Sequence, residues 1–184
     1  MPVLLDARDL VGDFSIAADE LGIGGWPCSL QAEFLPAPHR SGPLRRGCGA
    51  VYAFALAQHT TAAAGAGMVL KVGKAGANSN ARFQSQHYGL SAPSTLARSI
   101  LGHRIVWPWL GIDALDASNV RAWMLANLDR LNIFVPATSP LVLAPLEMYV
   151  SARIGSVFEG SAWRPGAQTS AVAGRNVAVP ERLR

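Results

Sequence analysis

Leu70-Lys71-Val72-Gly73-Lys74 is the stretch that decides the fold of this 184-residue chain. Its apolar residues have strand character, and Gly73 marks the exit from the strand. Upstream, the apolar run AVYAFAL at residues 50 to 56 has the length of a second strand. Between the two, residues 59 to 67 are rich in Thr, Ala and Gly, which is typical of a hairpin loop. The sequence therefore predicts two antiparallel strands, at residues 49 to 57 and 68 to 72.

A short helix is predicted directly after the second strand. Ser79 or Asn80 can cap a helix over residues 81 to 88, and Arg82 then lies in its first turn. First-turn side chains of such a helix point back over the end of the strand. We therefore expect Arg82 and Lys71 to face one pocket.

The rest of the chain predicts more helices than strands. Apolar stripes at helical spacing predict further helices, at residues 6 to 21, 94 to 101 and 116 to 131. A last helix is expected to begin at Pro140 or Pro145, since proline is tolerated in a first turn. Short apolar runs predict strands at residues 105 to 110 and 133 to 135. The mixture indicates an α+β protein.

The proline and glycine content suggests how the chain is divided. Residues 22 to 49 are rich in both and predict an irregular connection. We expect an N-terminal extension at residues 1 to 45, a main domain at residues 46 to 163 and a flexible C-terminal tail at residues 164 to 184. The N-terminal segment is acidic, and we expect it to pack on the main domain or to mediate self-association as a homodimer.

Composition and termini favour a cytoplasmic protein. Half of the residues are apolar, which is enough for a sizeable core. No apolar run approaches the length that a membrane span requires, so no membrane partner is expected. The N-terminal segment carries acids where a secretory signal would have a basic start and an apolar middle. Cys28 and Cys48 lack zinc-site spacing and are interpreted as small apolar residues.

Charge is distributed unevenly behind a net charge of +4. Asp and Glu are absent between Glu33 and Asp113. That interval holds eight cations, Arg40, Arg45, Arg46, Lys71, Lys74, Arg82, Arg98 and Arg104. Gathered on one face, they would attract a phosphate backbone. Spread over the surface, they would be ordinary solvated charges, and charge alone leaves both interpretations open.

Four side chains in this order have the chemistry that phosphodiester hydrolysis requires. The reaction needs a nucleophilic water, cations around the phosphoryl oxygens and stabilisation of a poor leaving group. Tyr52, Lys71 and Arg82, with a late Glu147 on a helix, can supply all three. Each also has a simpler interpretation: a strand tyrosine, an edge-strand lysine, a paired arginine and a glutamate near a helix N-terminus.

The order of these residues resembles the GIY-YIG endonuclease family over roughly residues 49 to 160. Val51-Tyr52 lies on one predicted strand, Lys71-Val72-Gly73 on the next, Arg82 on the following helix and Glu147 on a late helix. Gly49 stands one place early for the first triplet. Lys71 stands where most members have tyrosine, and restriction-type members with lysine at this position are known. The resemblance implies a small three-stranded antiparallel sheet flanked by helices, with one divalent metal ion.

Roles follow from the resemblance at the matched positions. Tyr52 would act on the attacking water as general base or would orient it, and Lys71 would lower the proton affinity of that phenol or contact the phosphate. Arg82 would bind the scissile phosphate and stabilise the transition state. Glu147 would bind the metal, Mg²⁺ or Mn²⁺.

Four further residues are expected to contact phosphate or DNA around this site, namely Lys74, His87, Arg98 and Arg104. The leading hypothesis is a metal-dependent DNA endonuclease, with RNA left open as a substrate. The alternative is a nucleic-acid-binding module that keeps the fold and has lost the chemistry, which Lys71 in place of tyrosine would explain. A third hypothesis is an interaction domain with an incidental basic surface.

Overall fold

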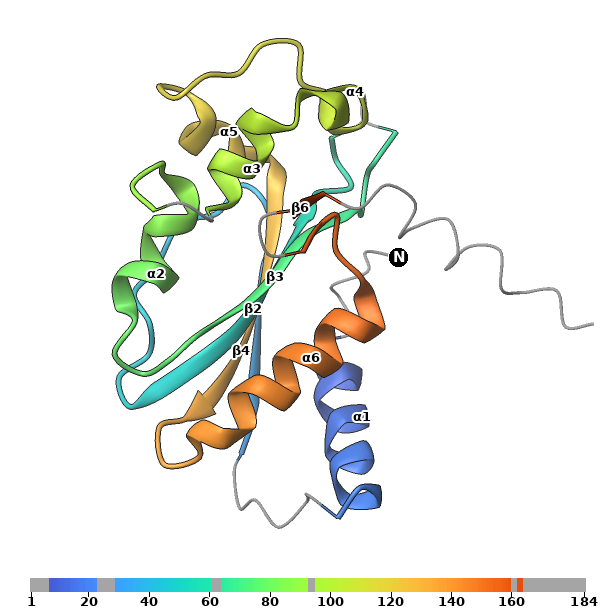
Figure 1. The fold of residues 1–184 in the computed structure, drawn as a ribbon, viewed down its shortest axis with the longest axis vertical. Helices are drawn as coiled ribbons and strands as arrows, with labels where there is room; N and C mark the ends of the chain where they lie inside the picture. The colour runs from blue at the N-terminus through green and yellow to red at the C-terminus, as the bar shows by residue number, and fades with distance from the viewer. Residues whose placement is uncertain (1–6, 23–28, 61–63, 93–94, 160–161, 164–184) are drawn as a thin grey trace, which may run out of the picture.

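The computed structural model describes residues 7–22, 29–60, 64–92, 95–159 and 162–163 and shows an α+β fold (Figure 1). Four antiparallel strands form one sheet in the order β1-β4-β2-β3. The strands are β1 (Gln31–Leu35), β2 (Cys48–Leu56), β3 (Val69–Ala75) and β4 (Leu128–Pro136). The long strands β2 and β4 lie in the middle of the sheet, and β3 forms one edge.

The predicted hairpin of β2 and β3 is confirmed, and its register fixes the faces of the sheet. Tyr52 pairs with Gly73, and Phe54 pairs with Lys71. Val51 pairs with Lys74 one residue along. Because successive side chains of a strand point to opposite faces, Tyr52 and Lys71 share one face while Lys74 lies on the other.

Helices cover both faces of the sheet (Figure 1). The face of Tyr52 is covered by α2 (Asn80–Gln84), the 3₁₀ turn η1 (Gln86–Tyr88), α3 (Leu96–Gly102) and α5 (Val120–Asn127). The opposite face is covered by α1 (Ala7–Glu20) and α6 (Leu143–Ile154). Leu10 and Phe14 of α1 are buried against this second face, and the Phe14 and Tyr149 rings meet edge to face with their centroids 5.5 Å apart. Apolar residues of β2 and β4 alternate between two cores, one on each side.

Shorter elements complete the described chain. They are the 3₁₀ turns η2 (Arg104–Val106) and η3 (Pro140–Val142), the helix α4 (Trp107–Leu110) and the strands β5 (Phe158–Glu159) and β6 (Ala162–Trp163), which pair with each other. No helix of the described residues combines the length and the apolar character needed to cross a membrane. The C-terminal tail predicted at residues 164 to 184 lies outside the described residues.

The expected sheet of three strands is wrong by one strand, because β1 arises within the stretch predicted as an irregular connection. β1 pairs with β4 in antiparallel register, with Glu33 opposite Asn132 and Phe34 opposite Leu131. Of the prolines that suggested a loop, Pro27 precedes the strand, and Pro36, Pro38 and Pro43 follow it. The prolines therefore bound the strand rather than prevent it.

Two further expectations from the sequence are wrong. The helix predicted at residues 116 to 131 ends as α5 at Asn127, and Leu128 opens the nine-residue strand β4. The strand predicted at residues 105 to 110 is instead helical, as η2 and α4. Pro108 lies in the first turn of α4, where it needs no donor, and Gly111 ends the helix in the left-handed region at φ 66°.

Candidate active site

The Tyr52 side chain lies over Gly73, its register partner on the edge strand β3. Tyr52 is 1% exposed, and a Cβ added at Gly73 would lie only 2.8 Å from the phenol oxygen. No side chain larger than hydrogen fits beneath the ring. Gly73 therefore allows the Tyr52 hydroxyl to reach across β3 toward the edge of the sheet.

His87 holds the Tyr52 hydroxyl from the other side. Its Nε2 atom and the Tyr52 Oη atom share a short hydrogen bond, and the two ring centroids lie 4.8 Å apart. His87 comes from η1, which follows α2 directly, and is buried. Its other ring nitrogen, Nδ1, is buried with no hydrogen-bond partner among the described residues. The sequence predicts that His87 contacts phosphate or DNA around the site; in the structure it is buried and hydrogen-bonded to Tyr52.

The environment keeps His87 neutral. Burial, followed by the positive charges of Lys71, Arg82 and Arg130 in that order, lowers the pKa of His87 to about 3. Burial also raises the pKa of the Tyr52 phenol, although the Arg82 hydrogen bond opposes that shift. At neutral pH the pair is therefore an uncharged phenol beside an uncharged imidazole.

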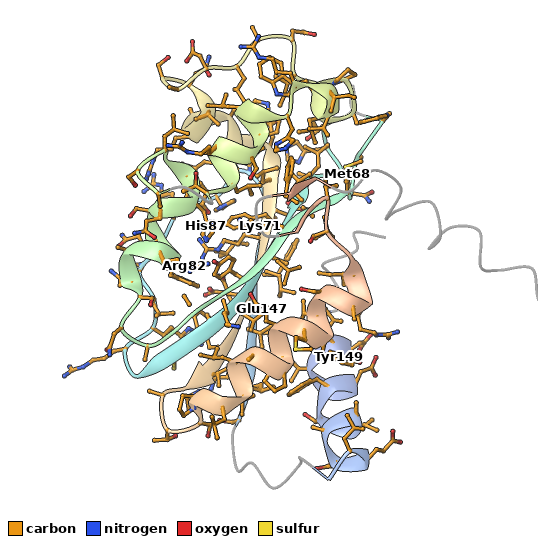
Figure 2. The ribbon with its side chains drawn as sticks, viewed as in Figure 1. Met68, Lys71, Arg82, His87, Glu147 and Tyr149 are labelled. Carbon is orange, nitrogen blue, oxygen red and sulfur yellow. The ribbon has the colours of Figure 1, made fainter. Side chains whose placement is uncertain are left out.

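Arg82 and Lys71 bring positive charge to the same face of the sheet, as the sequence predicts. Arg82 lies on α2, is exposed, and its Nε donates to Tyr52 Oη over a long distance of 3.5 Å. Lys71 is only 4% exposed, and burial followed by the charge of Arg82 lowers the pKa of its ammonium. Figure 2 shows Lys71, Arg82 and His87 between β3 and the α2 side of the molecule.

Glu147 and Lys74 lie together across the edge strand from this group. Lys74 Nζ donates to Glu147 Oε2 at 2.6 Å, and both side chains are partly exposed. Glu147 belongs to α6, which packs on the opposite face (Figure 2). Its carboxylate is nevertheless near enough to Tyr52 to raise the pKa of the phenol. The candidate site therefore straddles β3, with Tyr52 on one side and Glu147 on the other.

Arg98 and Arg104, the other two expected DNA contacts, are exposed and make their contacts elsewhere. Arg98 Nη2 donates to the Leu90 carbonyl oxygen at 2.9 Å. The Arg104 guanidinium lies 5.2 Å from the Trp107 ring centroid. Arg98 belongs to α3 and Arg104 to η2, and neither contacts the group formed by Tyr52, His87 and Arg82 in the hydrogen bonds described above.

Sequence reasoning missed Arg130, the largest fully buried side chain in the described chain. Its guanidinium donates to Asn132 Oδ1 at 2.8 Å, to Tyr88 Oη at 3.2 Å and to the Phe83 carbonyl at 3.0 Å. It also lies 4.2 Å from the Phe83 ring centroid. Arg130 pairs with Phe54 across the strands and so shares the face of Tyr52. The alternation of Arg130 and Asn132 with apolar residues was the available signal, and the helical interpretation of this stretch concealed it.

Glu147 is the one predicted metal ligand, and the chemistry of the site fits only a lightly held ion. The described residues contain no cluster of three His, Cys, Asp or Glu side chains that could hold a metal. Mg²⁺ keeps several waters and is often bound by one or two carboxylates together with substrate phosphate. A single partly exposed carboxylate suits an ion that arrives with the substrate, and Lys74 has to give up Oε2 or share it.

A scan against protein-family models, a search of curated proteins and a search of solved structures each found no match for this chain. The resemblance to GIY-YIG endonucleases therefore stays a prediction from the sequence.

Proposed function

We propose that this protein is a metal-dependent endonuclease of the GIY-YIG type that hydrolyses DNA phosphodiester bonds. The observation that carries the proposal is the Tyr52 hydroxyl, bonded to neutral His87 and approached by Arg82, at an edge strand with Glu147 beyond it. This arrangement offers a proton acceptor, a phosphate-binding cation and a metal ligand around one edge strand. Together they can meet the three requirements of phosphodiester hydrolysis, namely activation of water, cations around the phosphoryl oxygens and stabilisation of the leaving group.

Tyr52 and His87 act together on the attacking water. Arg82 Nε donates to the phenol oxygen. We place the His87 hydrogen on Nδ1, so that Nε2 accepts the phenol hydrogen in the hydrogen bond that the two side chains share. A water bound at the phenol oxygen passes its proton to Tyr52 as it attacks phosphorus. Tyr52 passes its own proton to His87, which becomes imidazolium, and the phenol remains neutral throughout.

The substrate itself makes His87 a better base. In the free protein the cations Lys71, Arg82 and Arg130 oppose an imidazolium at His87. A bound phosphodiester carries negative charge, which increases in the transition state and offsets these cations. The affinity of His87 for a proton therefore rises when phosphate is in place, which restricts proton transfer to the complex.

Arg82 and Lys71 differ in how they stabilise the phosphate. Arg82 is exposed and can donate directly to phosphoryl oxygens. Lys71 is buried beside Tyr52 and contributes positive potential from beneath the site. Glu147 would hold the Mg²⁺ or Mn²⁺, which would stabilise the negative charge on the leaving oxygen.

The test is nicking of supercoiled plasmid with Mg²⁺ or Mn²⁺ by the wild type and by Arg82→Ala, Glu147→Ala and His87→Ala. Each substitution is expected to reduce the rate by about 100-fold or more. Arg153→Ala and Glu20→Ala are matched controls, because each removes an exposed charge outside the site, and they are expected to retain the rate. Cutting that survives both Arg82→Ala and Glu147→Ala would refute the proposal.

One observation favours the alternative, a DNA-binding module without catalysis. The Lys74–Glu147 ion pair occupies the carboxylate that the metal needs. Such a module would bind DNA equally well in EDTA and in Mg²⁺, would ignore Glu147→Ala, and would leave the plasmid intact under both metals. Metal-dependent cutting rules it out.

A further inference from the structure

A second polar pocket lies beside Tyr52 on the same face of the sheet. It is a cavity of about 250 Å³ lined by residues of β1, β4 and the segment between β1 and β2, together with Phe83 of α2. Arg130 and Asn132 belong to its buried lining, while Arg40 and Arg45 are exposed. Asn132 is the register partner of Tyr52. The pocket is therefore one strand away from the phenol.

The buried charge in this pocket is not matched by an acid. Among the described residues the ion pairs are Arg45–Glu33, Lys74–Glu147 and Arg153–Asp13, and none involves Arg130. Arg130 is 1% exposed, and its hydrogen-bond acceptors are an amide, a hydroxyl and a carbonyl. A buried cation without an anionic partner is unfavourable, and neutral acceptors with aromatic rings compensate it only in part. A guanidinium in this state favours an anion in the cavity that it lines.

The overall charge of the pocket also favours a bound anion. Three arginines, Arg40, Arg45 and Arg130, line it with a single carboxylate, Glu33, so its formal charge is three minus one, or +2. The carboxylate is already engaged on both sides. Arg45 contacts one Glu33 oxygen at 3.3 Å, and Asn132 Nδ2 donates to the other at 3.0 Å.

We propose that this pocket binds a phosphate group of the DNA strand, next to the one held at Tyr52. The choice of DNA as the source rests on the proposed function. The position follows from the register of β2 and β4, which sets the pocket beside Tyr52 on one face. Arg40 and Arg45 at the exposed side bind the phosphate oxygens, and Arg130 adds positive electrostatic potential from the buried side of the pocket.

The first measurement is fluorescence anisotropy of a short duplex oligonucleotide in EDTA, at several salt concentrations between about 50 and 200 mM. Arg40→Ala and Arg45→Ala are each expected to weaken binding about five- to tenfold and to lower the salt slope by about one. Glu33→Gln keeps the side-chain shape and removes the negative charge, so it is expected to tighten binding about threefold. A purely structural role for Glu33 predicts no gain.

Arg153→Ala is the matched control, since it removes an exposed arginine from α6 on the opposite face and is expected to leave binding unchanged. If Arg40→Ala and Arg45→Ala weaken binding no more than Arg153→Ala does, the proposal is overturned. Arg130 itself is tested by Arg130→Met, which keeps an unbranched side chain and removes the guanidinium, together with circular dichroism to confirm folding. A folded Arg130→Met that binds DNA as the wild type does would also overturn it.

The second measurement identifies the source of the phosphate. Neutral methylphosphonate linkages are placed one at a time along the oligonucleotide. One linkage is expected to weaken wild-type binding while leaving Arg45→Ala unaffected, as a double-mutant cycle requires. The other arm of the experiment titrates inorganic phosphate alone. If phosphate binds in a way that depends on Arg45, and no DNA linkage couples to Arg45, the assignment to DNA is overturned.

Failure of this inference and failure of the proposed function can be distinguished. The binding experiments contain no metal and read no cleavage. If no linkage couples to Arg45 while plasmid nicking is intact, the phosphate pocket is refuted and the proposed nuclease function is unaffected. If a linkage couples to Arg45 but no metal supports nicking, the nuclease function is refuted and the phosphate pocket is unaffected.

Discussion

His87 is a buried histidine that folding keeps uncharged, and this has a thermodynamic consequence. Its pKa is about 3 in the folded protein against an ordinary value of 6.5 for histidine. Between these values the unfolded chain binds the proton and the folded protein does not. The contribution of His87 to stability is therefore fully present above pH 6.5 and is lost as the pH falls toward 3.

We predict that the free energy of unfolding of the wild type falls more steeply with acid than that of His87→Phe. The difference in slope is expected to approach about 1.4 kcal/mol per pH unit between about pH 6 and pH 4. Urea unfolding at a series of pH values measures it. The comparison with His87→Phe removes the contribution of His39, whose pKa burial also lowers. Parallel curves for the two proteins would contradict the neutral, buried His87.

The residues of the site could be predicted from the sequence only where local structure brings them together. Tyr52 and Arg82 meet because a hairpin is followed at once by a helix, and both elements are visible in the sequence. The partnership of Tyr52 with His87 depends on the turn from α2 into η1, which helical periodicity does not resolve. Arg130 was missed because a charged residue in a predicted amphipathic helix is expected to face solvent.

At the scale of elements, the edge strand β3 is the part of the sheet most constrained by the site. We predict that Gly73→Ala displaces the Tyr52 ring, destabilises the fold by about 1 to 3 kcal/mol and lowers the nicking rate about 100-fold. Thermal unfolding and plasmid nicking measure the two effects. Gly76→Ala is the matched control, because the nearest atom to a Cβ at Gly76 is Ser79 Oγ at 3.9 Å. Equal effects of the two substitutions would contradict the role given to Gly73.

The contact between β3 and α6 leads to a prediction about the metal. Lys74 neutralises the Glu147 carboxylate at 2.6 Å. We predict that Lys74→Met raises the affinity of the protein for Mn²⁺ about three- to fivefold, in line with an exposed ion pair worth up to about 1 kcal/mol. Electron paramagnetic resonance of free Mn²⁺ measures this without any cleavage. Arg98→Met should leave the affinity unchanged, and an unchanged affinity in Lys74→Met would indicate that Glu147 does not bind the ion.

Elements could be predicted where one periodicity dominates. The β2–β3 hairpin and the helices α1, α3 and α6 follow from apolar patterns that tertiary contacts do not override. The strand predicted at residues 133 to 135 is confirmed as the end of β4. The beginning of β4 was missed because it follows α5 without any intervening loop, so that one apolar stripe continues from the helix into the strand. The strand β1 was not predicted because its five residues pair with a segment about a hundred residues away, and no local pattern indicates such a pairing.

At the scale of the whole molecule, the sheet requires both of its helical layers. Leu10 and Phe14 of α1 cover the face that α6 shares. We predict that a chain beginning at Arg46 is insoluble or melts far below the full chain, because it lacks α1 and leaves β4 with an open edge. A chain that begins at Ser29 keeps β1 and separates the two losses. Soluble yield and thermal unfolding measure the outcome, and a stable, active chain from Arg46 would contradict it.

The pairing of β1 with β4 also has a consequence for biosynthesis. Glu33 and Asn132 sit opposite each other although 99 residues separate them along the chain. A ribosome adds about 5 to 20 residues per second, so β1 waits on the order of 5 to 20 seconds for its partner to emerge. Throughout that interval the sheet lacks the pairing of β1 with β4. Although β1 is synthesised before the other strands of this sheet, it is paired only after β4, the last of them, has emerged.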